Sequence, residues 1–100
     1  MPYEQSIDLA LAEGVLIRFS RSGRPIERYA VVLLVVHEGK WTEARLFDNH
    51  QGSHHMHRYT PNEGKQSAEI FHPGPTNAAI PAAIQHLKNH WEAITEPWRT

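Results

Sequence analysis

Short segments with an alternating or continuous apolar pattern, separated by turn residues, fill the first part of the chain and predict β-strands. The first clear one is Val15–Ser20, followed by a turn at residues 21–24 and a long second strand over Pro25–Val36. Residues 37–40 form the next turn, before a third strand over Trp41–Phe47. Short connections join antiparallel neighbours, so the three segments predict a meander.

Two more strands are expected, over His54–Thr60 and, after a turn at residues 61–64, over Ser67–Phe71.

The segment Ser6–Glu13 has two interpretations. Its first serine as a cap and the glycine that follows it as a stop favour a short helix. The alternation of its apolar and polar residues favours a strand almost as well.

The second half of the chain contains the best helix candidate. After His72–Pro75, a helix is expected to start near Thr76 or Asn77 and to run to Ile94. Its apolar residues fall on one stripe: Ile80, Ile84, Leu87, Trp91 and Ile94. Pro81 is tolerated only in or near the first turn. Such a helix is about 27 Å long, enough to cover one face of a small sheet.

The run Tyr29–Val36 does not alternate, and a strand that is apolar on both sides needs cover on both faces of its sheet. The helix covers one face. We expect the other to be buried by the N-terminal segment, by a second copy of the chain or by a partner protein. The predicted fold class is therefore α+β, an antiparallel meander sheet of four to five strands with a C-terminal amphipathic helix on one face. Residues 1–100 form a single domain, with frayed ends at 1–5 and 97–100.

The composition excludes several classes of protein. The chain has no cysteine, which rules out disulfides, thiolate metal sites and cysteine nucleophiles. No apolar run approaches the roughly 20 residues of a membrane-spanning helix, and the first residues lack a secretion signal, so a cytoplasmic protein without membrane contact is expected. Ten basic and eleven acidic side chains give a net charge of -1. Binding to nucleic acid would therefore need a local basic patch.

The reactive side chains concentrate in one segment, residues 45–59, which holds four of the eight histidines of the chain. Alternate residues of a strand share a face, so His55, His57 and Tyr59 are expected on one side of the sheet. The other side receives the remaining residues of the same strand: His54, Met56 and Arg58.

A carboxylate, two imidazoles and an arginine are suited to phosphodiester cleavage, because they supply a base, an acid and a stabiliser of phosphate charge. Asp48 ends the strand before the histidines, where a tight loop brings it beside them. The candidate catalytic residues are Asp48, His55 and His57. The candidate substrate contacts are Arg45, Asn49, Arg58 and Tyr59.

Other interpretations of the cluster stay open. Turn pairs such as Asp48-Asn49 are common, and histidine clusters are more often structural than catalytic. No cofactor is needed for acid–base chemistry, but a divalent metal is a further option. Its ligands would be His55 and His57, joined by one of three nearby residues: Asp48, His50 or His72.

On the predicted helix, His86 and His90 are four residues apart. The glutamate of a metalloprotease motif is missing between them, so they are expected on a solvated flank of the helix.

The step Phe47-Asp48-Asn49 precedes a histidine-rich stretch, residues 54–57, within strands that are followed by a C-terminal helix. This arrangement resembles the TumE-like toxins of bacterial toxin–antitoxin pairs, and the uncharacterised small bacterial domains near them, over residues 15–96. The resemblance implies a small toxin that acts on RNA and is neutralised by a helix-turn-helix antitoxin. It also implies that Asp48, His55 and His57 are the functional residues. Arg58 would then contact a phosphate.

The sequence also leaves two functions open in which the protein is not an enzyme. One is a noncatalytic homodimeric binding protein, in which the polar cluster is a ligand or partner surface. The other is a histidine-rich metal-binding domain without hydrolytic activity.

Overall fold

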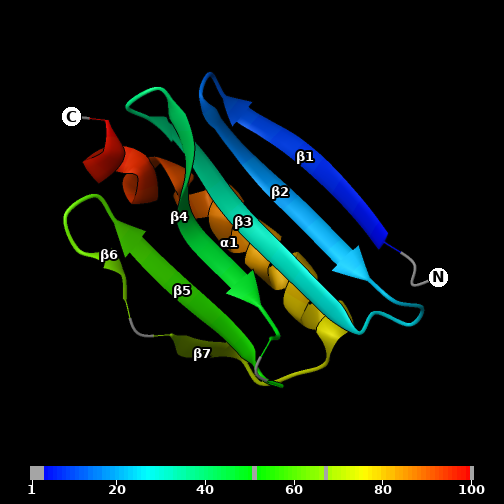
Figure 1. The fold of residues 1–100 in the computed structure, drawn as a ribbon. Helices are drawn as coiled ribbons and strands as arrows, with labels where there is room; N and C mark the ends of the chain where they lie inside the picture. The colour runs from blue at the N-terminus through cyan, green and yellow to red at the C-terminus, as the bar shows by residue number, and fades with distance from the viewer. Residues whose placement is uncertain (1–3, 51, 67, 100) are drawn as a thin grey trace.

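The computed structural model describes residues 4–50, 52–66 and 68–99 and contains one antiparallel sheet and one long helix (Figure 1). The strands are β1 (Glu4–Ala12), β2 (Val15–Ser22), β3 (Arg28–His37), β4 (Lys40–Asp48), β5 (His54–Thr60), β6 (Gly64–Lys65) and β7 (Glu69–His72). The helix α1 spans Thr76–Thr95, and the 3-10 turn η1 (Glu96–Trp98) follows it. The sheet order is β1-β2-β3-β4-β5-β6, with β7 beside β5. The predicted α+β meander with a C-terminal helix is confirmed, but the sheet of the described residues has seven strands instead of the expected four to five, because the N-terminal segment and the short β6 also pair in it.

The N-terminal segment is a strand and not a helix. In β1, Ile7 lies opposite Phe19 of β2, and Gly14 makes the connecting turn with a positive φ of 75°. Backbone of this kind favours glycine, which has no Cβ to clash. Because β1 extends the sheet at its edge, it does not cover a face. The N-terminal segment therefore does not bury the second face of the sheet. The two other expected possibilities, a second copy of the chain or a partner protein, stay predictions.

Several residues that were expected to be frayed belong to the folded part of the chain. Glu4 and Gln5 belong to β1, and Trp98 is buried, with its backbone oxygen 3.0 Å from Nδ1 of His37. The expectation of frayed ends is wrong for these residues. Residues 1–3 and 100, and Ser67 at the start of the predicted fifth strand, lie outside the described residues.

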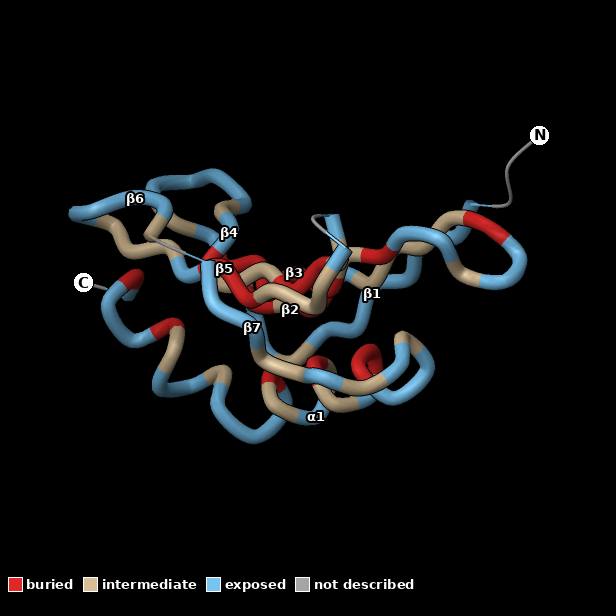
Figure 2. The backbone as a smooth tube through the Cα atoms, turned by 90° about the horizontal axis from the view of Figure 1, so that it is seen from below, coloured by how far each residue is buried: buried red, intermediate tan, exposed pale blue. Residues whose placement is uncertain are grey.

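The core lies between the sheet and α1, which Figure 2 shows as a second layer beneath the strands. Alternate residues of β3 point to the helix: Tyr29, Val31, Leu33 and Val35. On the helix, Ala79 and Ala83 are fully buried, and Leu87 packs one turn later. Alanine at these positions lets the helix backbone approach the strands closely.

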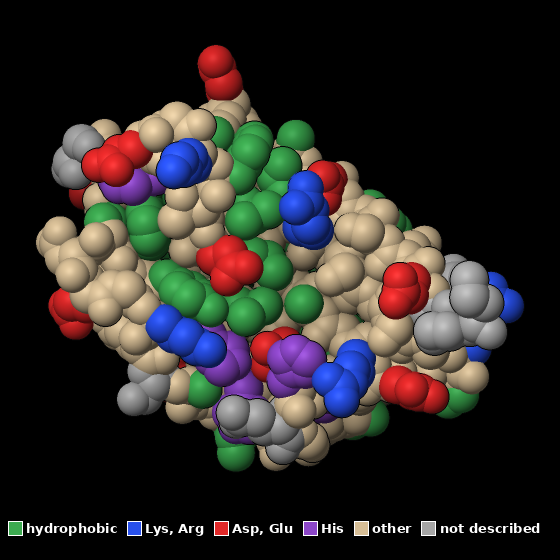
Figure 3. Space-filling view, viewed as in Figure 1, with side chains coloured by type: hydrophobic (Ala, Val, Ile, Leu, Met, Phe, Trp, Pro, Cys, Tyr) green, Lys and Arg blue, Asp and Glu red, His purple; other side chains and the backbone are tan. Residues whose placement is uncertain are grey.

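The opposite side of the sheet carries no helix, and we call it the helix-free face (Figure 3). Its central residues Val32 and Leu34 are only 9% and 8% exposed, because neighbouring strands flank them. Toward one end of the face, the cross-strand neighbours Val36 and Trp41 are 41% and 53% exposed. Figure 3 shows apolar side chains gathered in the middle of this face and histidines along one side.

Candidate functional site

Strand β5 distributes its histidines over both sides of the sheet, as the alternation predicts. Met56 lies opposite Phe47, in the core under the helix. His55 lies opposite Asp48, and His57 follows on the same helix-free face. The chain therefore brings together the three residues that were predicted to be catalytic.

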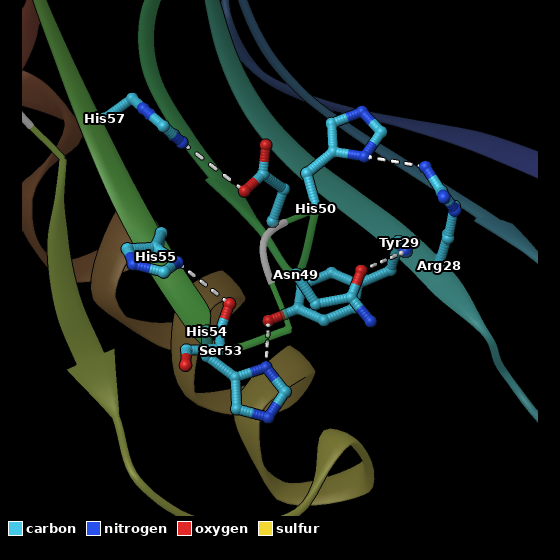
Figure 4. Close-up of polar contacts among 9 residues, drawn as sticks. Arg28, Tyr29, Asn49, His50, Ser53, His54, His55 and His57 are labelled. Carbon is cyan, nitrogen blue, oxygen red and sulfur yellow. Dashed lines mark hydrogen bonds and ion pairs between the residues drawn. The ribbon is translucent and has the colours of Figure 1, made fainter.

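Asp48 and His57 form a buried pair. Nε2 of His57 lies 3.4 Å from Oδ1 of Asp48 (Figure 4), and the two residues are 6% and 5% exposed. The carboxylate accepts, so Nε2 carries the proton and the ring is fixed in one tautomer and orientation. Nδ1 of His57 is buried and has no hydrogen-bond partner in the described part of the chain.

His55 is the more accessible of the two histidines. Its Nδ1 lies 3.0 Å from the backbone oxygen of Ser53. A carbonyl only accepts, so Nδ1 donates, and in the neutral ring Nε2 is left as a proton acceptor. The rings of His55 and His57 lie 6.4 Å apart between centroids. His55 thus offers a base next to the buried pair.

A cation close to these histidines is Arg28, which was not among the predicted substrate contacts. Its Nη1 lies 3.0 Å from Nδ1 of His50. A guanidinium only donates, so Nδ1 of His50 accepts, and the proton of the neutral imidazole sits on Nε2. The register explains the neighbourhood, because Ala30, two residues after Arg28 on the same face, lies opposite Asp48.

A shallow hollow of about 440 Å³ lies beside these residues on the helix-free face. Arg28 and His50 form part of its wall, and hydroxyl groups come from the first two strands: Ser6, Ser20 and Ser22. We call this region, with Arg28, Asp48, His50, His55 and His57, the polar end. On the helix-free face, His55 contributes a proton acceptor, His50 an N–H donor and Arg28 a guanidinium.

Two predicted substrate contacts lie elsewhere. Arg45 is the cross-strand partner of Leu33, and Arg58 is the partner of Arg45, so both belong to the helix side of the sheet. Arg58 also donates to Glu69 at 2.8 Å. The sheet therefore separates both arginines from Asp48, as the alternation along the strands predicts, and they do not share a face with the three predicted catalytic residues.

The other two predicted contacts have structural partners. The side chain of Asn49 accepts from the backbone nitrogen of Tyr29 at 3.1 Å and donates to the oxygen of Glu27 at 2.9 Å. It ties the end of β4 to the start of β3. Tyr59 is half-buried, and burial, followed by the negative charge and hydrogen bond of Glu43, raises the pKa of its hydroxyl.

Tyr29 lies beneath the polar end, on the helix side. Its hydroxyl is 2.7 Å from Nδ1 of His54, and the residue is 4% exposed. Burial, and then the negative charge of Asp48, raises the pKa of Tyr29 to about 12.

The free energy of unfolding is expected to fall as the pH rises from about 10 to about 12, partly because of Tyr29. An unfolded tyrosine ionises near pH 10, so in this window the unfolded chain releases a proton that the folded chain retains. Urea unfolding at several pH values should show a smaller decline for Tyr29→Phe than for the wild type. Identical declines would contradict the assignment.

A metal site does not assemble from the predicted ligands. In residues 4–50, 52–66 and 68–99, no three side chains of histidine, cysteine, aspartate or glutamate gather at metal-binding distance. His72 lies on the helix side, where its ring is 6.2 Å from that of His54 between centroids. Over the same ranges, no helix has the length and hydrophobicity needed to cross a membrane.

Comparison with known proteins gives one family. The family described as a domain of unknown function (DUF7718) matches residues 3–100. No match was found among curated proteins or among solved structures.

Proposed function

The chain belongs to the DUF7718 family, a domain of unknown function, and we propose that it cleaves RNA at the polar end of its helix-free face. The observation that carries the proposal is the pair formed by Asp48 and His57 beside His55. A buried carboxylate that fixes one imidazole, next to a second imidazole with an accessible acceptor nitrogen, is an arrangement suited to proton transfer.

The proposed reaction uses the 2′-hydroxyl of the substrate as the nucleophile. Nε2 of His55 takes the hydroxyl proton, the 2′-oxygen bonds to phosphorus, and the bond from phosphorus to the 5′-oxygen breaks. Water supplies the proton of the departing oxygen, the Nε2–H of His50 donates a hydrogen bond to the phosphate, and Arg28 stabilises the charge that develops there. The products are a 2′,3′-cyclic phosphate and a 5′-hydroxyl. Asp48 and His57 position the site without contacting the reacting atoms.

We further propose a biological setting, a toxin neutralised by a helix-turn-helix antitoxin. The support is the resemblance of Phe47-Asp48-Asn49 and the histidines after it to TumE-like toxins. An antitoxin that covered the polar end would block access of RNA to His55 directly.

The test is incubation of the purified chain with end-labelled single-stranded RNA. Cleavage to fragments with 2′,3′-cyclic phosphate ends is expected. The matched control is the same sequence with 2′-O-methyl groups, which has no nucleophile and should stay intact. Cleavage of both substrates, or of neither, would contradict the proposed reaction.

A second candidate function is a noncatalytic homodimeric binding protein. The observation in its favour is the pair of exposed apolar residues Val36 and Trp41 at the other end of the helix-free face. Light scattering measures the molar mass in solution. A wild-type mass of twice the 11.5 kDa of one chain, and a mass of one chain for Trp41→Asp, would support a dimer through this surface. A single chain mass for the wild type would count against it.

A further inference from the structure

Arg45 occupies an unusual position between β4 and α1. Its Nε is buried without a hydrogen-bond partner, and its Nη1 faces only the sulfur of Met56, at 3.9 Å. Within the part of the chain that the structure describes, no carboxylate oxygen lies within ion-pair distance of this guanidinium. A half-buried guanidinium has five donors and no acceptor, so leaving them unmatched is unfavourable.

The groups around Arg45 add positive charge. Arg58 lies directly opposite on β5, an arrangement that destabilises a sheet when the two charges are alike. From the helix, His86 packs edge-on against Phe47, with ring centroids 5.7 Å apart, and His90 lies 4.7 Å from His86. The histidines predicted to lie on a solvated flank therefore border this cluster, and His86 is half-buried in it.

The charges of these groups act on one another. Burial lowers the pKa of His86, and the positive charges of His90, Arg45 and Arg58 lower it further. Burial also lowers the pKa of Arg45, and the charge of Arg58 adds to that effect. The one carboxylate that acts on Arg45 in the opposite direction is Glu69, which is already bonded to Arg58.

We propose that Arg45, Arg58, His86 and His90 form a binding site for a phosphate-class oxyanion between α1 and strands β4 and β5. Such an anion accepts hydrogen bonds from the guanidinium of Arg45 and from the N–H groups of the imidazoles, and its charge separates the two arginine charges. A metal cation at the paired histidines would instead face two guanidinium groups. The site lies across the sheet from the polar end and is independent of the proposed cleavage.

The test follows the ring protons of His86 by NMR while inorganic phosphate is added to the full chain. Bound phosphate should raise the pH at which His86 titrates, because the anion favours the charged ring. In Arg45→Gln, phosphate binding should weaken about tenfold or more. Lys88→Gln removes the same charge from an exposed position on the helix and should bind like the wild type.

A second titration with uncleavable 2′-O-methyl RNA separates two sources of phosphate. A response at lower concentration than inorganic phosphate assigns the site to a nucleic-acid backbone, and a response to phosphate alone assigns it to a small phosphorylated ligand. Absence of any change at His86 of the wild type with both probes would overturn the proposal, whatever the fold of the variants. Equal binding by a folded Arg45→Gln would overturn it too.

Discussion

Replacing His55 with alanine is expected to slow RNA cleavage by about 10²- to 10⁴-fold, the usual contribution of a general base. His55 is half-buried, and its Nδ1 donates to the oxygen of Ser53, which leaves Nε2 as the acceptor. Alanine removes the acceptor without disturbing the core, because the side chain lies on the helix-free face. The measurement is the initial rate of cleavage of one labelled RNA by wild type and variant.

The matched control for this prediction is His54→Ala. His54 is the preceding residue in β5, but its side chain lies across the sheet, where it bonds to Tyr29. This variant tests whether removing any histidine from the strand reduces the rate. If His54→Ala and His55→Ala lose activity equally while both remain folded, His55 has no special role in proton transfer.

Replacing Phe47 with alanine is expected to lower the free energy of unfolding by about 3–5 kcal/mol. Phe47 is 1% exposed and packs edge-on against Phe71, with ring centroids 4.7 Å apart. It also contacts His86 of the helix, so the cavity would open at the junction of β4, β7 and α1. A domain of this size has a total stability of about 5–15 kcal/mol, so the variant would be close to unfolding.

Urea unfolding measures this loss, and Val36→Ala supplies the comparison. Val36 is 41% exposed on the helix-free face, so its truncation should cost well under half as much as that of Phe47. Similar losses for the two variants would mean that the helix-free face is buried in solution, as it would be in a dimer.

The sheet and helix were predictable because their signals are local. A strand over His54–Thr60 was predicted, and β5 has these bounds. The faces of its side chains were predictable as well, because alternate residues of a strand point to opposite sides of the sheet. The same rule separates Arg45 from Asp48, which are an odd number of residues apart on one strand. The N-terminal segment stayed ambiguous because its alternation, which favours a strand, competed with a serine cap and a glycine stop that favour a helix.

His50 was expected near the cluster, but its contact with Arg28 was not predictable, because the position of Arg28 depends on register. The bulge of β4 opposite Leu33 and Leu34 sets which residue of β3 faces Asp48. No sequence motif reveals that bulge. The surroundings of Arg45 were equally hidden, since only the packed structure shows that its Nε is buried without a hydrogen-bond partner.

We propose that the histidines of the helix-free face carry out the cleavage of RNA. The most direct test is growth of a bacterial culture after induced expression of the wild-type chain, beside His55→Ala/His57→Ala and Lys88→Ala, all shown to be folded. Arrest with loss of RNA is expected for the wild type and Lys88→Ala, and normal growth for the double variant. Arrest by all three chains, or by none of them, would contradict the claim.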